Sequence, residues 1–121
     1  MLIRYKKSYE KIAMGLLSFM PEEKDLKQLC STMNLYEESE EWQLYLWKET
    51  NVIGLVGITV EEDIVKIQHI SVNPSHRDEG IGKSMLLALK KMYKEYEIVP
   101  NERVESFYDK CGLDCDELNP I

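Results

Sequence analysis

The most informative pattern along the chain is a change of hydrophobic period between residues 64 and 96. Residues 64–72 form an apolar run rich in β-branched side chains, which is typical of a strand, and Pro74 ends it because proline cannot donate to a sheet ladder. After a short turn that contains two glycines, apolar residues return at helical spacing over 81–96. The helix has one apolar face, made of Ile81, Met85, Leu89, Met92, Tyr93 and Tyr96. The pattern predicts a strand, a tight turn and a helix.

The first third of the chain predicts a short edge strand at 1–6 and two helices. Ser8 is a suitable N-cap for a helix over 9–20, and Pro21 breaks that helix and begins a second one over 22–36. The expected buried faces are Ile12, Leu16, Phe19 and Met20 in the first helix and Leu26, Leu29, Cys30 and Met33 in the second.

Alternating apolar and polar residues predict two further strands, at 42–49 and 52–60. Short turns at 50–51 and 61–63 join them to each other and to strand 64–72, so we expect three sequential antiparallel strands.

After the glycine turn and its helix, residues 97–99 are too few and too apolar for anything but a buried strand. One helix separates them from strand 64–72, so the two strands should be parallel, with a right-handed crossover. A last helix is expected over 102–110, with Gly112 as its stop. Its predicted inward residues are Val104, Phe107, Tyr108 and Cys111.

These elements predict an α/β (α+β) fold in one domain, residues 1–121. Its central sheet is mixed and mostly antiparallel, strands 64–72 and 97–99 are the parallel pair, and four helices flank the sheet. A chain of 121 residues with 44% hydrophobic and 31% charged residues suits one soluble domain.

Charge and composition restrict the partners. The formal net charge of −7 argues against nucleic acid, because phosphate binding requires a basic surface. An acidic exterior favours cationic acceptors such as amines. No membrane span or signal peptide is apparent, so we expect a cytoplasmic protein. The odd set Cys30, Cys111 and Cys115 contains no C-x-x-C pair, and we expect no disulfide framework and no metal.

The turn between the strand and the helix has the features of a phosphate-binding loop. Two glycines bring the backbone close to a ligand at a helix start, where N–H groups lack partners. A Walker loop would need glycine at position 77, which is Arg77, and a dinucleotide loop would need it at position 85, which is Met85. The remaining pattern is Arg77-x-x-Gly80-x-Gly82. In the alternative explanation, the glycines only permit a tight turn and close packing.

The motif, its position between a strand and an amphipathic helix, and the order of the elements resemble the GNAT N-acetyltransferase superfamily. The resemblance implies that acetyl-CoA is the cosubstrate. It also implies that the loop and the start of the helix bind the pyrophosphate. The central strand would pair with the pantetheine arm and polarise the thioester carbonyl. Asn101 would contact the arm, and Tyr108 would protonate the leaving thiolate. The implied cofactor-binding residues are Ile70, Ser71, Val72, Arg77, Asp78, Glu79, Gly80, Ile81, Gly82, Lys83, Ser84, Asn101 and Tyr108.

The residue that accepts the amine proton is left open. Some superfamily members use a glutamate near the start of the central strand, but Lys66 occupies the matching position. His69 is the best substitute because it titrates near neutrality, and strand alternation would place it on the same face as Ile67 and Ser71. It is equally a candidate for a purely structural histidine. A water relay through Glu61, Glu62 or a backbone carbonyl is another alternative, whereas His76 is expected to support the phosphates or to face solvent.

The expected function is acetyl-CoA-dependent acetylation of a primary amine, on a small molecule or a protein lysine. Superfamily members usually continue with two more strands along the acceptor cleft, but only residues 114–121 follow Leu113. That wall should be absent, minimal or supplied by another subunit. Two alternatives are a CoA-binding module without turnover and a regulatory homodimer.

Overall fold

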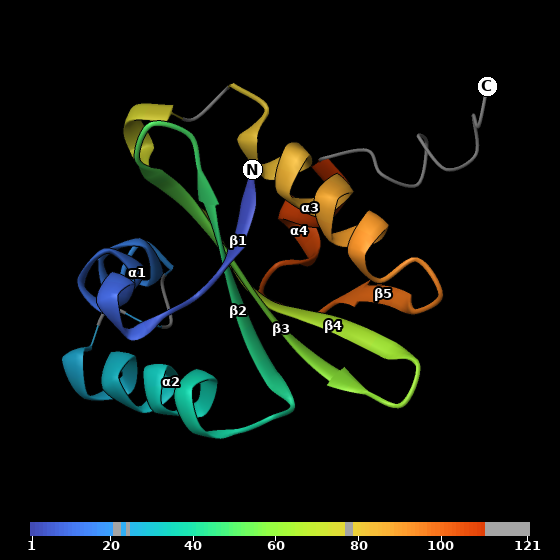
Figure 1. Ribbon diagram of the computed structural model, residues 1–121, viewed down its shortest axis with the longest axis horizontal. Helices are drawn as coiled ribbons and strands as arrows, with labels where there is room; N and C mark the ends of the chain where they lie inside the picture. Colours follow the sequence, from blue (N-terminus) through green and yellow to red (C-terminus); the bar gives the residue numbers. More distant parts are fainter. Residues whose placement is uncertain (21–22, 24, 77–78, 111–121) are drawn as a thin grey trace.

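A computed structural model of the protein describes residues 1–20, 23, 25–76 and 79–110. Its centre is a five-stranded sheet in the order β1-β2-β3-β4-β5 (Figure 1). The strands are β1 Leu2–Arg4, β2 Trp42–Lys48, β3 Val52–Glu61, β4 Ile64–Val72 and β5 Glu97–Pro100. Neighbouring strands are antiparallel except β4 and β5, which are parallel. The predicted mixed sheet and its parallel pair are therefore confirmed.

The helices lie on the two faces of this sheet. In the described residues the α-helices are α1 Glu10–Leu17, α2 Leu26–Glu38, α3 Ile81–Met92 and α4 Glu105–Lys110. Helices α1 and α2 cover one face and α3 and α4 the other (Figure 1). Each face has its own cluster of buried apolar side chains. None of these helices has the length and apolar character needed to span a membrane.

The ends of the first two helices differ from the prediction. Ser8 does not cap α1, because Lys7–Tyr9 form a 3-10 turn and α1 begins at Glu10. Helix α2 begins at Leu26, where the Asp25 carboxylate accepts a hydrogen bond from the Lys27 N–H at 3.4 Å. Pro21 and Glu22 lie outside the described residues.

The buried stripes of these two helices were also predicted in part wrongly. Ile12 is 39% exposed and Leu26 is 67% exposed, and Phe19 and Cys30 are exposed as well. The buried residues are Ala13, Leu16 and Leu17 in α1 and Leu29, Thr32, Met33 and Tyr36 in α2. The prediction assigned the buried positions to large apolar residues. The small side chain of Ala13 instead lets α1 approach the core. Thr32 and Tyr36 can be buried because their hydroxyls form hydrogen bonds.

The last two helices are shorter than predicted. Helix α3 ends at Met92, and its C-cap residue, Tyr93, turns its hydroxyl to Tyr45, 2.8 Å away. Met92 and Tyr96 are exposed. Helix α4 begins at Glu105 rather than 102, and the predicted positions Cys111 and Gly112 lie outside the described residues.

Strand β4 contains one extra residue, Gln68. Gly57 of β3 pairs with His69, but the next residue, Ile58, pairs with Ile67. This bulge reverses the alternation along β4. Ile67 and Ile70 therefore both pack in the cluster on the α3 and α4 side, while the His69 side chain contacts Tyr36 of α2 on the other face. The expectation that His69 and Ile67 share a face was wrong, because strict alternation does not survive a bulge.

Candidate functional site

The bulge coincides with the point where β5 leaves β4. Their pairing ends at Ile67 and Pro100, and the next residue, Asn101, holds the junction. The Asn101 backbone N–H donates to the Ile67 carbonyl at 3.0 Å, and its side-chain amide donates to the carbonyl and the side chain of Gln68. Its Oδ1 accepts from the Val104 N–H at 3.1 Å. Asn101 therefore fixes both the bulge and the turn into α4.

Beyond this junction one edge of β4 is open. The Asn73 N–H donates to the Ile53 carbonyl of β3 at 2.8 Å, so the backbone groups of Ile70 and Val72, which alternate with it, point to the opposite edge. Within the described residues no strand pairs with β4 along that edge after Ile67. An extended molecule with amide groups can hydrogen-bond there as an added strand would.

The N-terminus of α3 begins shortly after the same end of β4. Gly80, the N-cap, has φ 75° and ψ 15°, a left-handed conformation that favours glycine. Among the described residues, no atom lies within 4 Å of the position that a side chain on Gly80 would take. The first helical hydrogen bond there runs from the Ser84 N–H to the Gly80 carbonyl, so the N–H groups of Ile81 and Gly82 precede the first hydrogen bond within the helix. Such a helix start binds anions.

The second glycine of the motif has a packing role. A side chain on Gly82 would overlap the Phe107 ring of α4. Close packing therefore explains Gly82, as the alternative explanation held, while it leaves the helix start able to bind an anion.

The structure places the other predicted loop residues in different surroundings. Arg77 and Asp78 lie outside the described residues. Glu79 is exposed, and its Oε1 lies 3.3 Å from His76 Nδ1. Lys83 and Ser84 are half-buried on the first turn of α3. Of the β4 residues, the Ser71 hydroxyl is buried without a hydrogen-bond partner. Tyr108 is buried in the cluster beside α3.

The alternative proton acceptors are less favourably placed. Glu61 pairs with Ile64 at the far end of β4, and Glu62 lies in the adjacent turn. Both are exposed and remote from the open edge. Lys66 is exposed as well.

His69 belongs to a buried polar network that includes Glu23, Thr32 and Tyr36. The Tyr36 hydroxyl lies 2.5 Å from His69 Nδ1, and Glu23 Oε2 lies 3.3 Å from His69 Nε2. The Thr32 hydroxyl donates to Glu23 Oε1 at 2.6 Å. Glu23 is fully buried and His69 is 2% exposed. Both ring nitrogens of His69 therefore have partners.

Burial controls the protonation of this network. It lowers the pKa of His69, against the opposing effect of the Glu23 carboxylate, and the Arg103 charge lowers the pKa further. Burial also raises the pKa of Tyr36 well above its ordinary value. At neutral pH, His69 is neutral and Tyr36 is protonated.

Sequence reasoning identified His69 but missed its partners. Tyr36 lies seven residues after Leu29, which places it on the buried face of α2. Gly57 was a second indication of these partners, because a glycine inside a strand often marks a place where another group packs closely against the backbone. A side chain there would overlap the Tyr36 hydroxyl.

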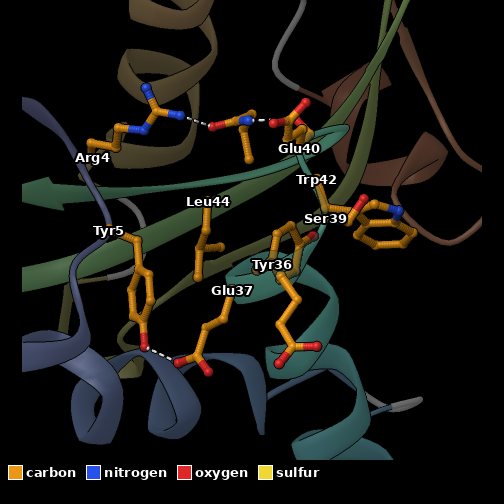
Figure 2. Close-up of a pocket in the computed structure, with 10 residues that line it drawn as sticks. Arg4, Tyr5, Tyr36, Glu37, Ser39, Glu40, Trp42 and Leu44 are labelled. Atoms are coloured by element: carbon orange, nitrogen blue, oxygen red, sulfur yellow. Dashed lines mark hydrogen bonds between the residues drawn. The ribbon is translucent and has the colours of Figure 1, made fainter.

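A separate pocket of about 230 Å³ opens where the end of α2 meets the start of β2 (Figure 2). Its lining comes from β1, α2, β2 and the segments next to them, and includes Arg4, Glu37, Glu38 and Trp42. The Tyr5 hydroxyl donates to Glu37 there at 2.7 Å. Tyr36 lines this pocket too, but no residue of β4, β5, α3 or α4 does. The pocket is therefore distinct from the open edge of β4.

The sequence model of the acetyltransferase (GNAT) family matches residues 9–113. The chain belongs to this family. A relative from Bacillus methanolicus, described as an uncharacterized N-acetyltransferase in the lysA 3′ region, is 61% identical over 115 residues, which are 93% of this chain and 96% of the relative.

Solved structures of acetyltransferases share the fold of this GNAT protein. An acetyltransferase from Trypanosoma brucei superposes with a TM-score of 0.66 at 17% identity, over 93% of this chain and 90% of the other. The aminoglycoside N-acetyltransferase AAC(6′)-Iy in complex with CoA gives a TM-score of 0.70 at 14% identity, over 91% and 81%. The protein is a GNAT-type acyltransferase, and its cosubstrate is acetyl-CoA.

The described residues suit this cosubstrate. Acetyl-CoA combines a pyrophosphate with an extended arm that contains amide groups. Among the described residues, the chain offers the N-terminus of α3, open space at Gly80 and an edge of β4 without a paired strand. The chemistry of these groups matches the two parts of the molecule.

Proposed function

We propose that the protein transfers the acetyl group of acetyl-CoA to a primary amine of a small molecule or a protein lysine. The observation that carries this proposal is the open edge of β4, which begins at the Gln68 bulge and leads to the N-terminus of α3. The N-acetyltransferase name of the 61% identical relative supports an amine acceptor, and the net charge of −7 favours a cationic one.

In this proposal, bound acetyl-CoA supplies the acetyl group as a thioester. The N–H groups of Ile81, Gly82 and Lys83 hold the pyrophosphate, and the backbone of Ile70 and Val72 binds the arm. Asn101 shapes the edge through its bonds to Gln68. It acts as a positioning residue rather than through the direct contact expected from the sequence.

Tyr108 and His69 carry the proton transfers of the proposal. The Tyr108 hydroxyl donates a proton to the leaving thiolate. His69 accepts the proton that the amine loses. The proximity of His69 to Ile70, whose backbone groups face the open edge, supports this role.

A finer proposal concerns the metabolic context. Residues 1–8, 16–21, 69–77 and 99–102 resemble RibT, a small GNAT protein encoded with riboflavin-biosynthesis genes. We infer from this resemblance alone a link to riboflavin metabolism. It names no acceptor, and the alternatives are a riboflavin-pathway amine, a regulatory lysine and an unrelated metabolite.

A CoA-binding module without turnover is the second candidate. Two observations favour it. Both ring nitrogens of His69 already have hydrogen-bond partners within the protein, and Lys66 stands where some family members have the catalytic glutamate. Measuring turnover with a panel of amines distinguishes an acetyltransferase from a module that only binds CoA.

The test is release of free thiol from acetyl-CoA with polyamines, aminoglycosides, lysine peptides and amine intermediates of riboflavin synthesis. With an active acceptor, Tyr108→Phe should lower kcat by about tenfold or more and leave the KM for acetyl-CoA within about twofold, because the hydroxyl acts only on the leaving group.

Tyr93→Phe is the matched control, since it removes a hydroxyl that bonds Tyr45 on the same side of the sheet. It should retain the wild-type rate. Binding of acetyl-CoA without thiol release for any amine would favour the non-catalytic module.

A further inference from the structure

The buried network contains residues from three separate parts of the fold. Glu23 precedes α2, Tyr36 lies in the last turns of α2, and His69 follows the bulge of β4. Four polar side chains occupy the interior, and their mutual hydrogen bonds offset the cost of burial. In the network, His69 directly precedes Ile70, whose backbone groups face the open edge of β4.

The hydrogen bonds have one consistent set of directions. Tyr36 remains protonated, so its hydroxyl donates to His69 Nδ1. The His69 proton is then on Nε2 and is donated to Glu23 Oε2, while the Thr32 hydroxyl donates to Glu23 Oε1. In this arrangement the neutral imidazole accepts at Nδ1 and donates at Nε2, and both Glu23 oxygens accept.

We propose that Glu23 and Tyr36 are positioning residues that hold His69 as the proton acceptor of the acetylation. Glu23 fixes the tautomer and stabilises the imidazolium through a charged hydrogen bond. Tyr36 transfers the proton to Nδ1 of His69. This inference rests on the proposed N-acetyltransferase function.

The proton step balances within these groups. An N–H bond of the acceptor ammonium breaks, and the proton passes through water to form a new O–H bond at Tyr36. The original Tyr36 O–H bond breaks as an N–H bond forms at His69 Nδ1. The amine keeps its electron pair for attack on the acetyl carbon, and His69 becomes an imidazolium beside the Glu23 carboxylate. The C–S bond breaks as Tyr108 protonates the thiolate, and the second proton of the nitrogen, lost when the amide forms, returns through water to Tyr108. The proton later returns to solvent by the reverse transfers.

Tyr36 is the member of the network that lines a pocket, and we propose that the proton returns to solvent by this route. It lines the pocket of Figure 2, whereas Glu23, Thr32 and His69 do not. Proton return through Tyr36 requires no opening of the buried Glu23 and His69 pair.

The expected pH dependence follows from the groups that face His69. These are Glu23 before α2, Tyr36 on α2 and Arg103 in the turn after β5, while β3 presents Gly57 without a side chain. Only neutral His69 accepts a proton, so activity should rise with pH through its pKa. Burial lowers that pKa, so the acid limb should lie below the ordinary value of about 6.5.

The first test uses the unaltered protein. Nitrogen NMR of the His69 ring should show a neutral Nε2–H tautomer at pH 7, and its titration should coincide with the acid limb of kcat/KM. If the acid limb of kcat/KM and the NMR titration of His69 gave different pKa values, the proposal would be overturned. This test uses the wild-type protein, so it holds even if every variant fails to fold.

The second test uses Glu23→Gln and Tyr36→Phe, which nearly keep the side-chain shapes. Each should lower kcat about tenfold or more without changing the Kd of CoA, and Glu23→Gln should move the acid limb to lower pH because it removes the charge that opposes the lowered pKa. Tyr5→Phe is the matched control, since it removes a hydroxyl from the same pocket but outside the network. It should leave the rate and the profile unchanged.

Failure of the inference and failure of the function give different results. Full activity and an unchanged profile in Glu23→Gln and Tyr36→Phe would show a purely structural network in a working enzyme. Absence of turnover in the wild type, with CoA still bound, would instead contradict the proposed acetylation and with it the inference.

Discussion

Gly57 explains how the Tyr36 hydroxyl of α2 reaches over β3 to His69 on the same face of the sheet. It pairs with His69, and the Tyr36 hydroxyl occupies the space that a side chain at position 57 would take. A strand normally disfavours glycine, because glycine adds no packing and has more backbone freedom to lose. Its presence here makes room for the hydrogen bond to His69.

Gly57→Ala should therefore destabilise the protein. The added methyl overlaps the Tyr36 side chain, which is buried and cannot move without breaking its bond to His69. We expect a loss of about 1–3 kcal/mol in the free energy of unfolding, measured by urea denaturation.

Gly15→Ala is the matched control. Gly15 is exposed in α1, and a side chain there would meet no atom within 4 Å. Alanine is the better helix former, so this change should stabilise the protein by up to about 1 kcal/mol. Equal effects of the two changes would contradict the close approach at Gly57.

Among the elements, β4 shows what a sequence pattern can and cannot predict. Its ends were predicted correctly, from the apolar run and the following proline. The bulge was not predicted, because Gln68 fits the alternation of a regular strand and the extra residue is visible only through its partners on β3 and Asn101. The helix ends were inaccurate for a related reason, since capping depends on local geometry as well as residue type.

Asn101→Ala tests the junction between β4 and β5. It removes the bonds to Gln68 and the acceptor for the Val104 N–H, which leaves polar groups unpaired near the core. We expect a loss of about 1–2 kcal/mol in the free energy of unfolding and weaker CoA binding, because the open edge is no longer fixed.

Asn73→Ala provides the comparison for Asn101→Ala. Its side chain accepts one exposed hydrogen bond, from the Ser75 N–H, at the end of β4. It should cost less stability and leave CoA affinity within about twofold. An equal loss of affinity in both variants would show that Asn101 has no special role in shaping the edge.

At the scale of the whole molecule, the order of helices and strands along the chain was enough to predict which strands pair and in which direction. A helix between two short apolar strands predicts a parallel pair, and tight turns predict antiparallel ones. The loop motif, with Gly80 in a left-handed cap, was likewise found from spacing. The network of Glu23, Tyr36 and His69 was not, because its members are 13 and 33 residues apart along the chain and only tertiary packing unites them.

The central claim is that the open edge of β4 and the N-terminus of α3 together bind CoA. Amide NMR of the isotope-labelled protein, titrated with CoA, tests it most directly. We predict saturable shifts of the Ile70 and Val72 amides together with those of Ile81–Lys83, and little change around the pocket near Trp42. Absence of saturable shifts, or shifts confined to that pocket, would contradict the account.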